Sequence, residues 1–202
     1  MGQYYYGVMN ASFDGKQNPI AFRNIEPGFL KLMEHSWWKN PYVNWFCKKL
    51  TEASFRVGWV GDYSDSCGCP DGIFLAAHGC DAEDEEHPKY TETIRVCDNY
   101  FTLNDKYLVN HSKKQYLDCT KYYRESIKYS EWYHGAFWVV HPLPLLTCIG
   151  NGLGGGDYRG INKEKAGFWF WDILEVCGTA PEGYEELNIA FGEKQLKKGG
   201  DV

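Results

Sequence analysis

The stretch HPLPLLTCIGNGLGGGDYRG, residues 141–160, constrains the fold more than any other part of the sequence. Five of the seven residues at 150–156 are glycines, and glycine packs no side chain and loses the most backbone entropy on folding. Such a run is justified where the backbone must take positive φ angles or approach another group closely. We therefore predict a loop here that lies against a bound partner, with an ordinary surface turn as the alternative.

The spacing of these glycines does not match a phosphate-binding fingerprint, because the Lys-Ser/Thr pair of a P-loop is absent and no predicted helix follows directly. Exposed main-chain N–H groups can nevertheless hold an anion. We therefore predict that the loop binds a small anionic or nucleotide-like ligand. The residues expected to contact the ligand are Asn151, Gly154, Gly155, Gly156, Asp157, Tyr158 and Arg159.

Short apolar runs bounded by turn residues indicate about seven or eight strands. They lie at 4–9, 28–34, 55–60, 91–97, 107–111, 115–119, 136–140 and 166–176. One helix is predicted over 41–52, because Asn40 is a good N-cap, Pro41 suits the first helical position, and apolar residues recur from Val43 to Leu50 with helical spacing. Residues 61–90 are predicted as loop. The apolar residues of 122–133 fit neither the periodicity of a helix nor that of a strand.

This pattern predicts an α+β fold, with one or two helices packed on a mainly antiparallel sheet. Its 202 residues, of which 44% are hydrophobic, suit a single domain over 1–191, followed by a polar tail at 192–202. The aromatic content of 17% fits a β-rich core or a recognition surface.

The formal net charge of −6 argues against a general grip on a phosphate backbone, so nucleic acid is not an expected partner. A basic surface on a host protein is compatible with this charge. No signal peptide and no apolar run of membrane-spanning length is visible, which predicts a cytosolic protein that does not enter a membrane. The eight cysteines are then expected to be reduced thiols.

Two acidic residues follow glycine next to predicted strands or loops, and a histidine precedes a proline. Asp62 and Asp157 could together perform acid–base chemistry or bind a divalent cation, and the alternative is that each shapes a turn. His141 precedes Pro142 and the glycine-rich loop, and a nucleophilic pair with Cys148 can be imagined. The alternative for His141, as for other histidines at strand ends such as His111, is a hydrogen bond at a strand corner.

A zinc site is a further hypothesis, because short Cys-x-Cys and His-x-Cys pairs occur in one segment. Its ligands would be Cys67, Cys69, His78 and Cys80. Structural zinc sites usually place two residues between paired cysteines, so these spacings are tighter than the common pattern. The alternative is a set of reduced loop cysteines.

The segments EHSWWKNPYVN, RVGWVGDYSD, KYLVNHSKKQYLD and HPLPLLTCIGNGLGGGDYRG resemble an uncharacterised family of small proteins from phages and prophages of gut Firmicutes, over about residues 30–175. The resemblance implies a phage accessory protein that acts on host machinery or on host defence signals, and it carries over no catalytic residue. The leading hypothesis is thus a counter-defence protein that binds a small anionic ligand or a host protein. The alternatives are a hydrolase or transferase that uses Asp62, Asp157 and His141, and a structural phage component; a homo-oligomer is compatible with each.

Overall fold

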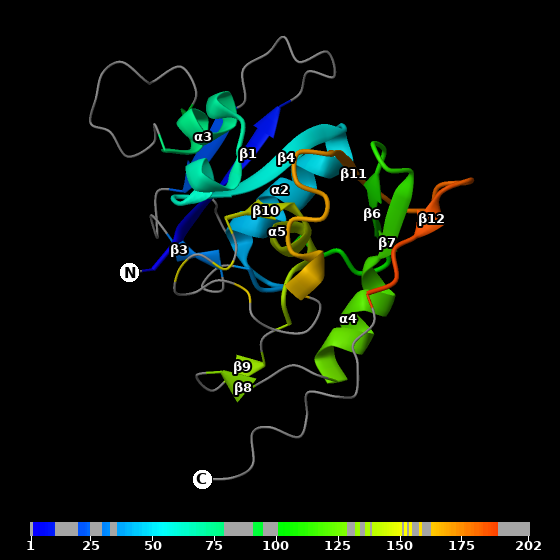
Figure 1. Ribbon diagram of the computed structural model, residues 1–202. Helices are drawn as coiled ribbons and strands as arrows, with labels where there is room; N and C mark the ends of the chain where they lie inside the picture. Colours follow the sequence, from blue (N-terminus) through cyan, green and yellow to red (C-terminus); the bar gives the residue numbers. More distant parts are fainter. Residues whose placement is uncertain are drawn as a thin grey trace.

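The computed structural model describes residues 2–10, 20–24, 30–32, 36–78, 91–94, 101–128, 132–133, 136–137, 139–150, 152, 154, 158 and 163–189. Within these residues a large, mainly antiparallel sheet carries the fold, and helices pack against it (Figure 1). The predicted α+β class is confirmed. Among the described helices, none combines the length and the apolar character that crossing a bilayer requires. The predicted tail at 192–202 lies outside the described residues.

The strands are β1 (Tyr4–Asn10), β2 (Ile20–Asn24), β3 (Leu30–Lys31), β4 (Phe55–Gly61), β5 (Thr91–Ile94), β6 (Tyr107–Asn110), β7 (Gln115–Asp118), β8 (Trp132–Tyr133), β9 (Ala136–Phe137), β10 (Cys148–Ile149), β11 (Ile173–Cys177) and β12 (Glu185–Glu186). The α-helices are α2 (Pro41–Glu52), α3 (Asp71–His78), α4 (Cys119–Lys128) and α5 (Pro142–Thr147). Two 3₁₀-helices are η1 (Ser64–Cys67) and η3 (Lys163–Lys165).

The strand β4 lies at the centre of the main sheet. The order along the sheet is β12-β7-β6-β11-β4-β1-β2-β5, with β10 also beside β4 and β3 beside β1. The antiparallel pairing of β1 with β4 runs from Tyr5 opposite Gly61 to Asn10 opposite Arg56. Because β1 and β4 have neighbours on both sides and are covered on both faces, their sequences are nearly continuous apolar runs.

Alternate residues of β1 and β4 enter two separate hydrophobic clusters. Tyr5 of β1 and Trp59 of β4 belong to the larger cluster, which includes the buried residues of α2 and α5. Val8 and Val60 face the other way and pack with Ile73 and the two alanines of α3. Since successive side chains of a strand point to opposite faces, the sheet has α2 and α5 on one face and α3 on the other.

The helix α2 begins and ends at the predicted residues. The Asn40 side-chain oxygen accepts hydrogen bonds from the backbone N–H groups of Tyr42 (2.9 Å) and Val43 (3.2 Å), and Pro41 fills the first helical position. The fully buried ring of Phe46 lies against Gly7 of β1, where a Cβ would overlap the ring. Glycine at this position therefore lets α2 approach the sheet closely.

The prediction of a loop over 61–90 is wrong for the described part of that range, which contains η1 and α3. Ile73, Ala76 and Ala77 recur with helical spacing and are buried against the sheet. This signal is present in the sequence but is short. Residues 79–90 lie outside the described residues.

The prediction of one long strand over 166–176 is also wrong, because the strand β11 begins only at Ile173. The preceding segment folds over the end of α5, where the N–H of Gly167 donates to the carbonyl of Leu145 (2.9 Å) and the N–H of Trp169 to that of Leu146 (2.7 Å). The last carbonyls of a helix lack partners within it, and this segment supplies them. The Pro-spaced run is itself the helix α5, which the sequence pattern did not indicate.

The other strands follow the sequence pattern to different extents. The predicted strands at 4–9, 55–60, 107–111 and 115–119 correspond to β1, β4, β6 and β7. Only short strands, β3, β5 and β9, occur within the predicted 28–34, 91–97 and 136–140, which extend partly outside the described residues. The first part of the ambiguous range 122–133 belongs to α4, whose N-terminus is capped by the carboxylate of Asp118 bonded to the N–H of Lys121 (2.9 Å).

Candidate functional site

The glycine-rich loop and the Asp62 segment leave the sheet at the same edge. The short strand β10 runs parallel to β4, with Ile149 opposite Val60, so Gly150 and Gly61 follow the paired residues of two adjacent parallel strands. The carboxyl ends of parallel strands are common positions for ligand sites in sheets. The structure therefore brings together the start of the loop and the segment that carries Asp62, as the hypothesis of a shared site requires.

The side chain of Gln3 fills the space between these two strand ends and is fully buried (0% exposed). A Cβ at Gly61 or Gly150 would overlap its amide nitrogen, and a Cβ at Gly154 would lie 2.8 Å from its backbone nitrogen. We call Gln3, Gly61, Gly150 and Gly154 the glycine cage. The close backbone approach predicted from the glycines does occur at Gly150 and Gly154, but it is to a residue of the same chain.

The amide group of Gln3 is only partly satisfied inside the glycine cage. Its oxygen accepts a hydrogen bond from the hydroxyl of Tyr5 at 3.1 Å, whereas its nitrogen has no hydrogen-bond partner among the described residues. A primary amide nitrogen carries two N–H donors, and a buried donor without an acceptor costs about 1–3 kcal/mol. The glycine cage therefore contains a donor that an acceptor from a ligand would stabilise.

Two polar side chains make hydrogen bonds to the backbone beside the glycine cage. Asp62 is partly exposed, and its Oδ1 accepts a hydrogen bond from the backbone N–H of Tyr4 at 3.1 Å. No group of the described residues bonds to its second oxygen. The hydroxyl of Ser64 donates to the carbonyl of Ile149 at 2.9 Å and thereby fixes the end of β10. Asp62 thus has a structural role and retains one carboxylate oxygen for a ligand.

The structure gives His141 a structural position rather than the catalytic one considered from the sequence. The residue is fully buried and caps α5, since its Nδ1 accepts the N–H of Leu143 at 3.1 Å. Its Nε2 then carries the proton and lies 3.6 Å from the sulfur of Cys47. Burial lowers the pKa of the ring to about 3, so the imidazole stays neutral. With its only lone pair used at Nδ1, His141 cannot deprotonate Cys47.

The imagined pair of His141 with Cys148 is not what the structure shows. The thiol of Cys148 is buried and donates to the carbonyl of Leu145 at 3.4 Å, while Cys47 occupies the position beside the imidazole. Burial also raises the pKa of Cys47 well above its ordinary value, with a smaller contribution from Cys119. Both thiols are therefore core residues and not nucleophiles.

Of the residues predicted to contact a ligand, the structure describes Gly154 and Tyr158. Gly154 is part of the glycine cage, whereas Tyr158 is only 7% exposed and belongs to the larger hydrophobic cluster. Tyr158 therefore packs in the core, and its contact with a ligand stays a prediction. The other predicted contacts lie outside the described residues: Asn151, Gly155, Gly156, Asp157 and Arg159. Whether Asp157 meets Asp62 stays a prediction.

The predicted zinc ligands have different surroundings. Cys67 is exposed at the end of η1, whereas Cys69 is buried against α3, and His78 is the last residue of α3. Cys80 lies outside the described residues. Within the described part of the chain, no group of three His, Cys, Asp or Glu residues could hold a metal ion. The four-ligand zinc site stays a prediction.

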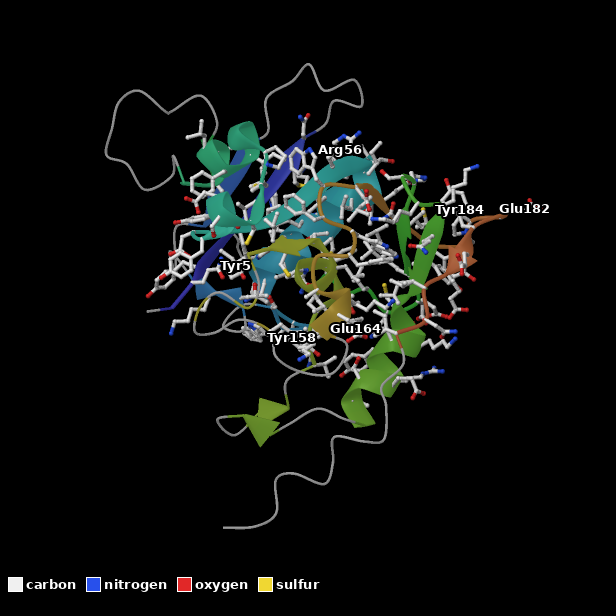
Figure 2. The ribbon with its side chains drawn as sticks, viewed as in Figure 1. Tyr5, Arg56, Tyr158, Glu164, Glu182 and Tyr184 are labelled. Atoms are coloured by element: carbon white, nitrogen blue, oxygen red, sulfur yellow. The ribbon has the colours of Figure 1, made fainter. Side chains whose placement is uncertain are left out.

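A second polar cluster, which sequence reasoning missed, lies on the other side of the molecule. The Nε2 of His111 is 2.7 Å from a carboxylate oxygen of Glu175, and its Nδ1 is 3.0 Å from the hydroxyl of Tyr184. Figure 2 shows Tyr184 beyond β7, at the side of the molecule opposite Tyr5. The two partners lie 64 and 73 positions from His111 in the sequence, so no local motif predicts this cluster.

No family model, curated protein or solved structure matches this chain. The geometry of its own residues is therefore what supports a function.

Proposed function

We propose that the protein binds a small anionic, nucleotide-like ligand at the glycine cage. The observation that carries the proposal is the buried amide nitrogen of Gln3, which has no partner in the described part of the chain and lies where the glycine-rich loop and the Asp62 segment meet. In this proposal the protein is a phage-type accessory protein of the host cytosol, and capture of the ligand interferes with a host defence signal.

The groups around the glycine cage suit a ligand that has both an acceptor and a donor. The Gln3 amide is a donor, and Gly150 and Gly152 take positive φ angles of 92° and 94°. The second oxygen of Asp62 is an acceptor that suits a hydroxyl group, as in the recognition of a ribose. A nucleotide supplies an anionic group for the amide and a hydroxyl for the carboxylate.

Binding requires a rearrangement, because the amide nitrogen of Gln3 is buried among the residues of the glycine cage. The backbone at Gly150 and Gly154 would have to separate from Gln3 to admit the ligand. Glycine permits such a change because it has a wide range of backbone angles and no side chain to repack. The proposal therefore includes local opening of the cage on binding.

The test is a thermal unfolding screen of the full chain against mononucleotides, cyclic nucleotides and dinucleotides. A ligand present at about 100 times its Kd adds about 2.7 kcal/mol to the stability, which in a chain of this size raises Tm by about 5 °C or more. The variant Gln3→Glu places a negative charge in the cage and should lose this rise. The variant Asn104→Asp makes the same charge change at an exposed turn and should keep it.

Two outcomes contradict the proposal. If Gln3→Glu retains the full rise in Tm, the ligand binds elsewhere. If no compound raises the Tm of the natural chain, and the protein instead assembles with increasing concentration, a structural phage component fits better. A hydrolase or transferase that uses Asp62, Asp157 and His141 has less support, because His141 is buried and its lone pair is engaged.

A further inference from the structure

In the polar cluster around His111, a carboxylate, an imidazole and a hydroxyl group follow one another, an arrangement that can activate the hydroxyl group. His111 lies in the turn between β6 and β7, Glu175 lies on β11, and Tyr184 lies just before β12. The side chains of His111 and Glu175 are 31% and 35% exposed, so water and small molecules reach both. The cluster is separate from the glycine cage and does not depend on the function proposed for it.

The surroundings of Glu175 keep its carboxyl group ionised. Partial burial raises the pKa of this group, but hydrogen bonds from His111, Ser54 and Cys177 together lower it below its ordinary value. The Ser54 hydroxyl donates to the same carboxylate oxygen as His111, at 3.1 Å. Burial, with a further contribution from Glu175, raises the pKa of Cys177 to about 11, so this residue stays a thiol. Cys177 is therefore a donor to Glu175 and not a competing nucleophile.

The ionised carboxylate determines which nitrogen of His111 carries the proton. An ionised carboxylate only accepts hydrogen bonds, so the Nε2 of His111, at 2.7 Å, is the protonated nitrogen of the neutral ring. The Nδ1 then has a lone pair and accepts the hydroxyl proton of Tyr184, at 3.0 Å. The sequence of groups is carboxylate, imidazole and hydroxyl, with each donor directed toward Glu175.

This is the arrangement by which a base activates a nucleophile and a third group orients the base. A tyrosine hydroxyl is mostly protonated at neutral pH and reacts slowly unless a base removes its proton as the new bond forms. His111 is placed to take that proton. Glu175 then stabilises the imidazolium that results, which makes it a positioning residue rather than a nucleophile or a base.

We propose that Tyr184 is a base-activated nucleophile that accepts an acyl group from a neutral or cationic ester. In this step the Tyr184 oxygen bonds to the acyl carbon, and its proton moves to the Nδ1 of His111. The bond from the acyl carbon to the ester oxygen breaks, and the departing alkoxide takes the proton from Nδ1. The products are an O-acyl tyrosine and an alcohol, and no oxidant or cofactor is needed.

The charge around Tyr184 sets the class of donor. The exposed carboxylates of Glu182 and Glu185 flank it in the sequence, and that of Glu175 lies behind His111. One exposed lysine, Lys114, is nearby, since its carbonyl accepts the N–H of Glu185 at 2.9 Å. The exposed ammonium of Lys113, in the same turn as His111, is paired with the carboxylate of Asp172. The carboxylates at the cluster therefore outnumber the remaining ammonium, which disfavours anionic electrophiles such as phosphate esters and favours neutral or positively charged ones.

The experiment measures the reactivity of Tyr184 toward phenylmethanesulfonyl fluoride, a neutral reagent that needs no knowledge of the natural donor. The tyrosine oxygen bonds to sulfur, fluoride leaves, and the proton passes to His111. Peptide mass spectrometry of the full chain gives the rate of labelling at each tyrosine. Tyr184 should react about tenfold or more faster than Tyr4, although Tyr4 is 39% exposed and Tyr184 is less exposed.

Variants separate a chemical role from a structural one. His111→Gln retains an amide that can bond to both Tyr184 and Glu175 but cannot take a proton, so labelling of Tyr184 should fall to the rate at Tyr4. Glu175→Gln should reduce the rate several-fold.

The inference is overturned if Tyr184 reacts no faster than Tyr4 or if His111→Gln keeps the natural rate. In each of these cases the cluster only fastens the segment before β12 to the sheet. The labelling experiment reports on Tyr184 alone and the thermal screen on the glycine cage, so the two proposals succeed or fail independently.

Discussion

At the scale of single residues, His141 makes the folded protein sensitive to acid. Burial lowers the pKa of its ring from the ordinary 6.5 to about 3, so between these values the unfolded chain binds a proton that the folded chain does not. The contribution of His141 to stability is full above pH 6.5 and is lost as the pH falls toward 3. Urea unfolding at a series of pH values should show a loss of up to ~1.4 kcal/mol per pH unit from this group.

The variant His141→Asn is the control for this prediction. Asparagine is a good N-cap, so its oxygen can accept the N–H of Leu143 while the titrating ring is removed. The pH dependence of its unfolding free energy should be shallower between pH 3 and pH 6.5. An unchanged slope would assign the acid sensitivity to the carboxylates instead.

Residue roles could be predicted from the sequence only where they depend on near neighbours. The sequence singled out His141 for its place before Pro142, and that proline does begin the helix that His141 caps. Histidine is not a usual N-cap, so the cap itself carried no signal. The role of His111 depends on Glu175 and Tyr184, which reach it only through the folding of distant segments.

At the scale of elements, the N-cap of α2 is a local device whose removal should be measurable. Asn40→Ala deletes the oxygen that accepts two backbone N–H groups and should lower the free energy of unfolding by about 1 kcal/mol. The neighbouring Lys39 is exposed, and Lys39→Ala should change the free energy of unfolding by less than about 0.5 kcal/mol. Chemical denaturation of both variants tests this, and equal effects would contradict the role of the cap.

The sequence likewise predicted those elements that depend on near neighbours and missed those that depend on distant segments. The bounds of α2 were correct because its cap, its proline and its apolar spacing all lie within the helix. Residues 166–171 have the apolar character of a strand, but the N–H groups of Gly167 and Trp169 bond to carbonyls at the end of α5. That competition between two possible partners is decided by tertiary contacts, which a local pattern does not contain.

At the scale of the whole molecule, stability should be greatest at the centre of the sheet. The strand β4 bonds to β1, β10 and β11, whereas β12 is a two-residue strand at the edge. Hydrogen exchange followed by mass spectrometry should therefore show the slowest exchange in β1 and β4 and much faster exchange in β12. Equal rates in β4 and β12 would mean that the sheet opens as one unit.

The class of fold could be predicted from strand patterns, but this strand order could not, because it depends on pairings between distant segments.

The position of β4 between β1 and β11 has a consequence for how the protein is made. On the ribosome β1 and β4 can pair early, but β11 is synthesised long after both, so one side of β4 stays open through most of translation. An open strand edge can pair with another chain. A nascent polypeptide of this kind would benefit from a chaperone until its last strands emerge.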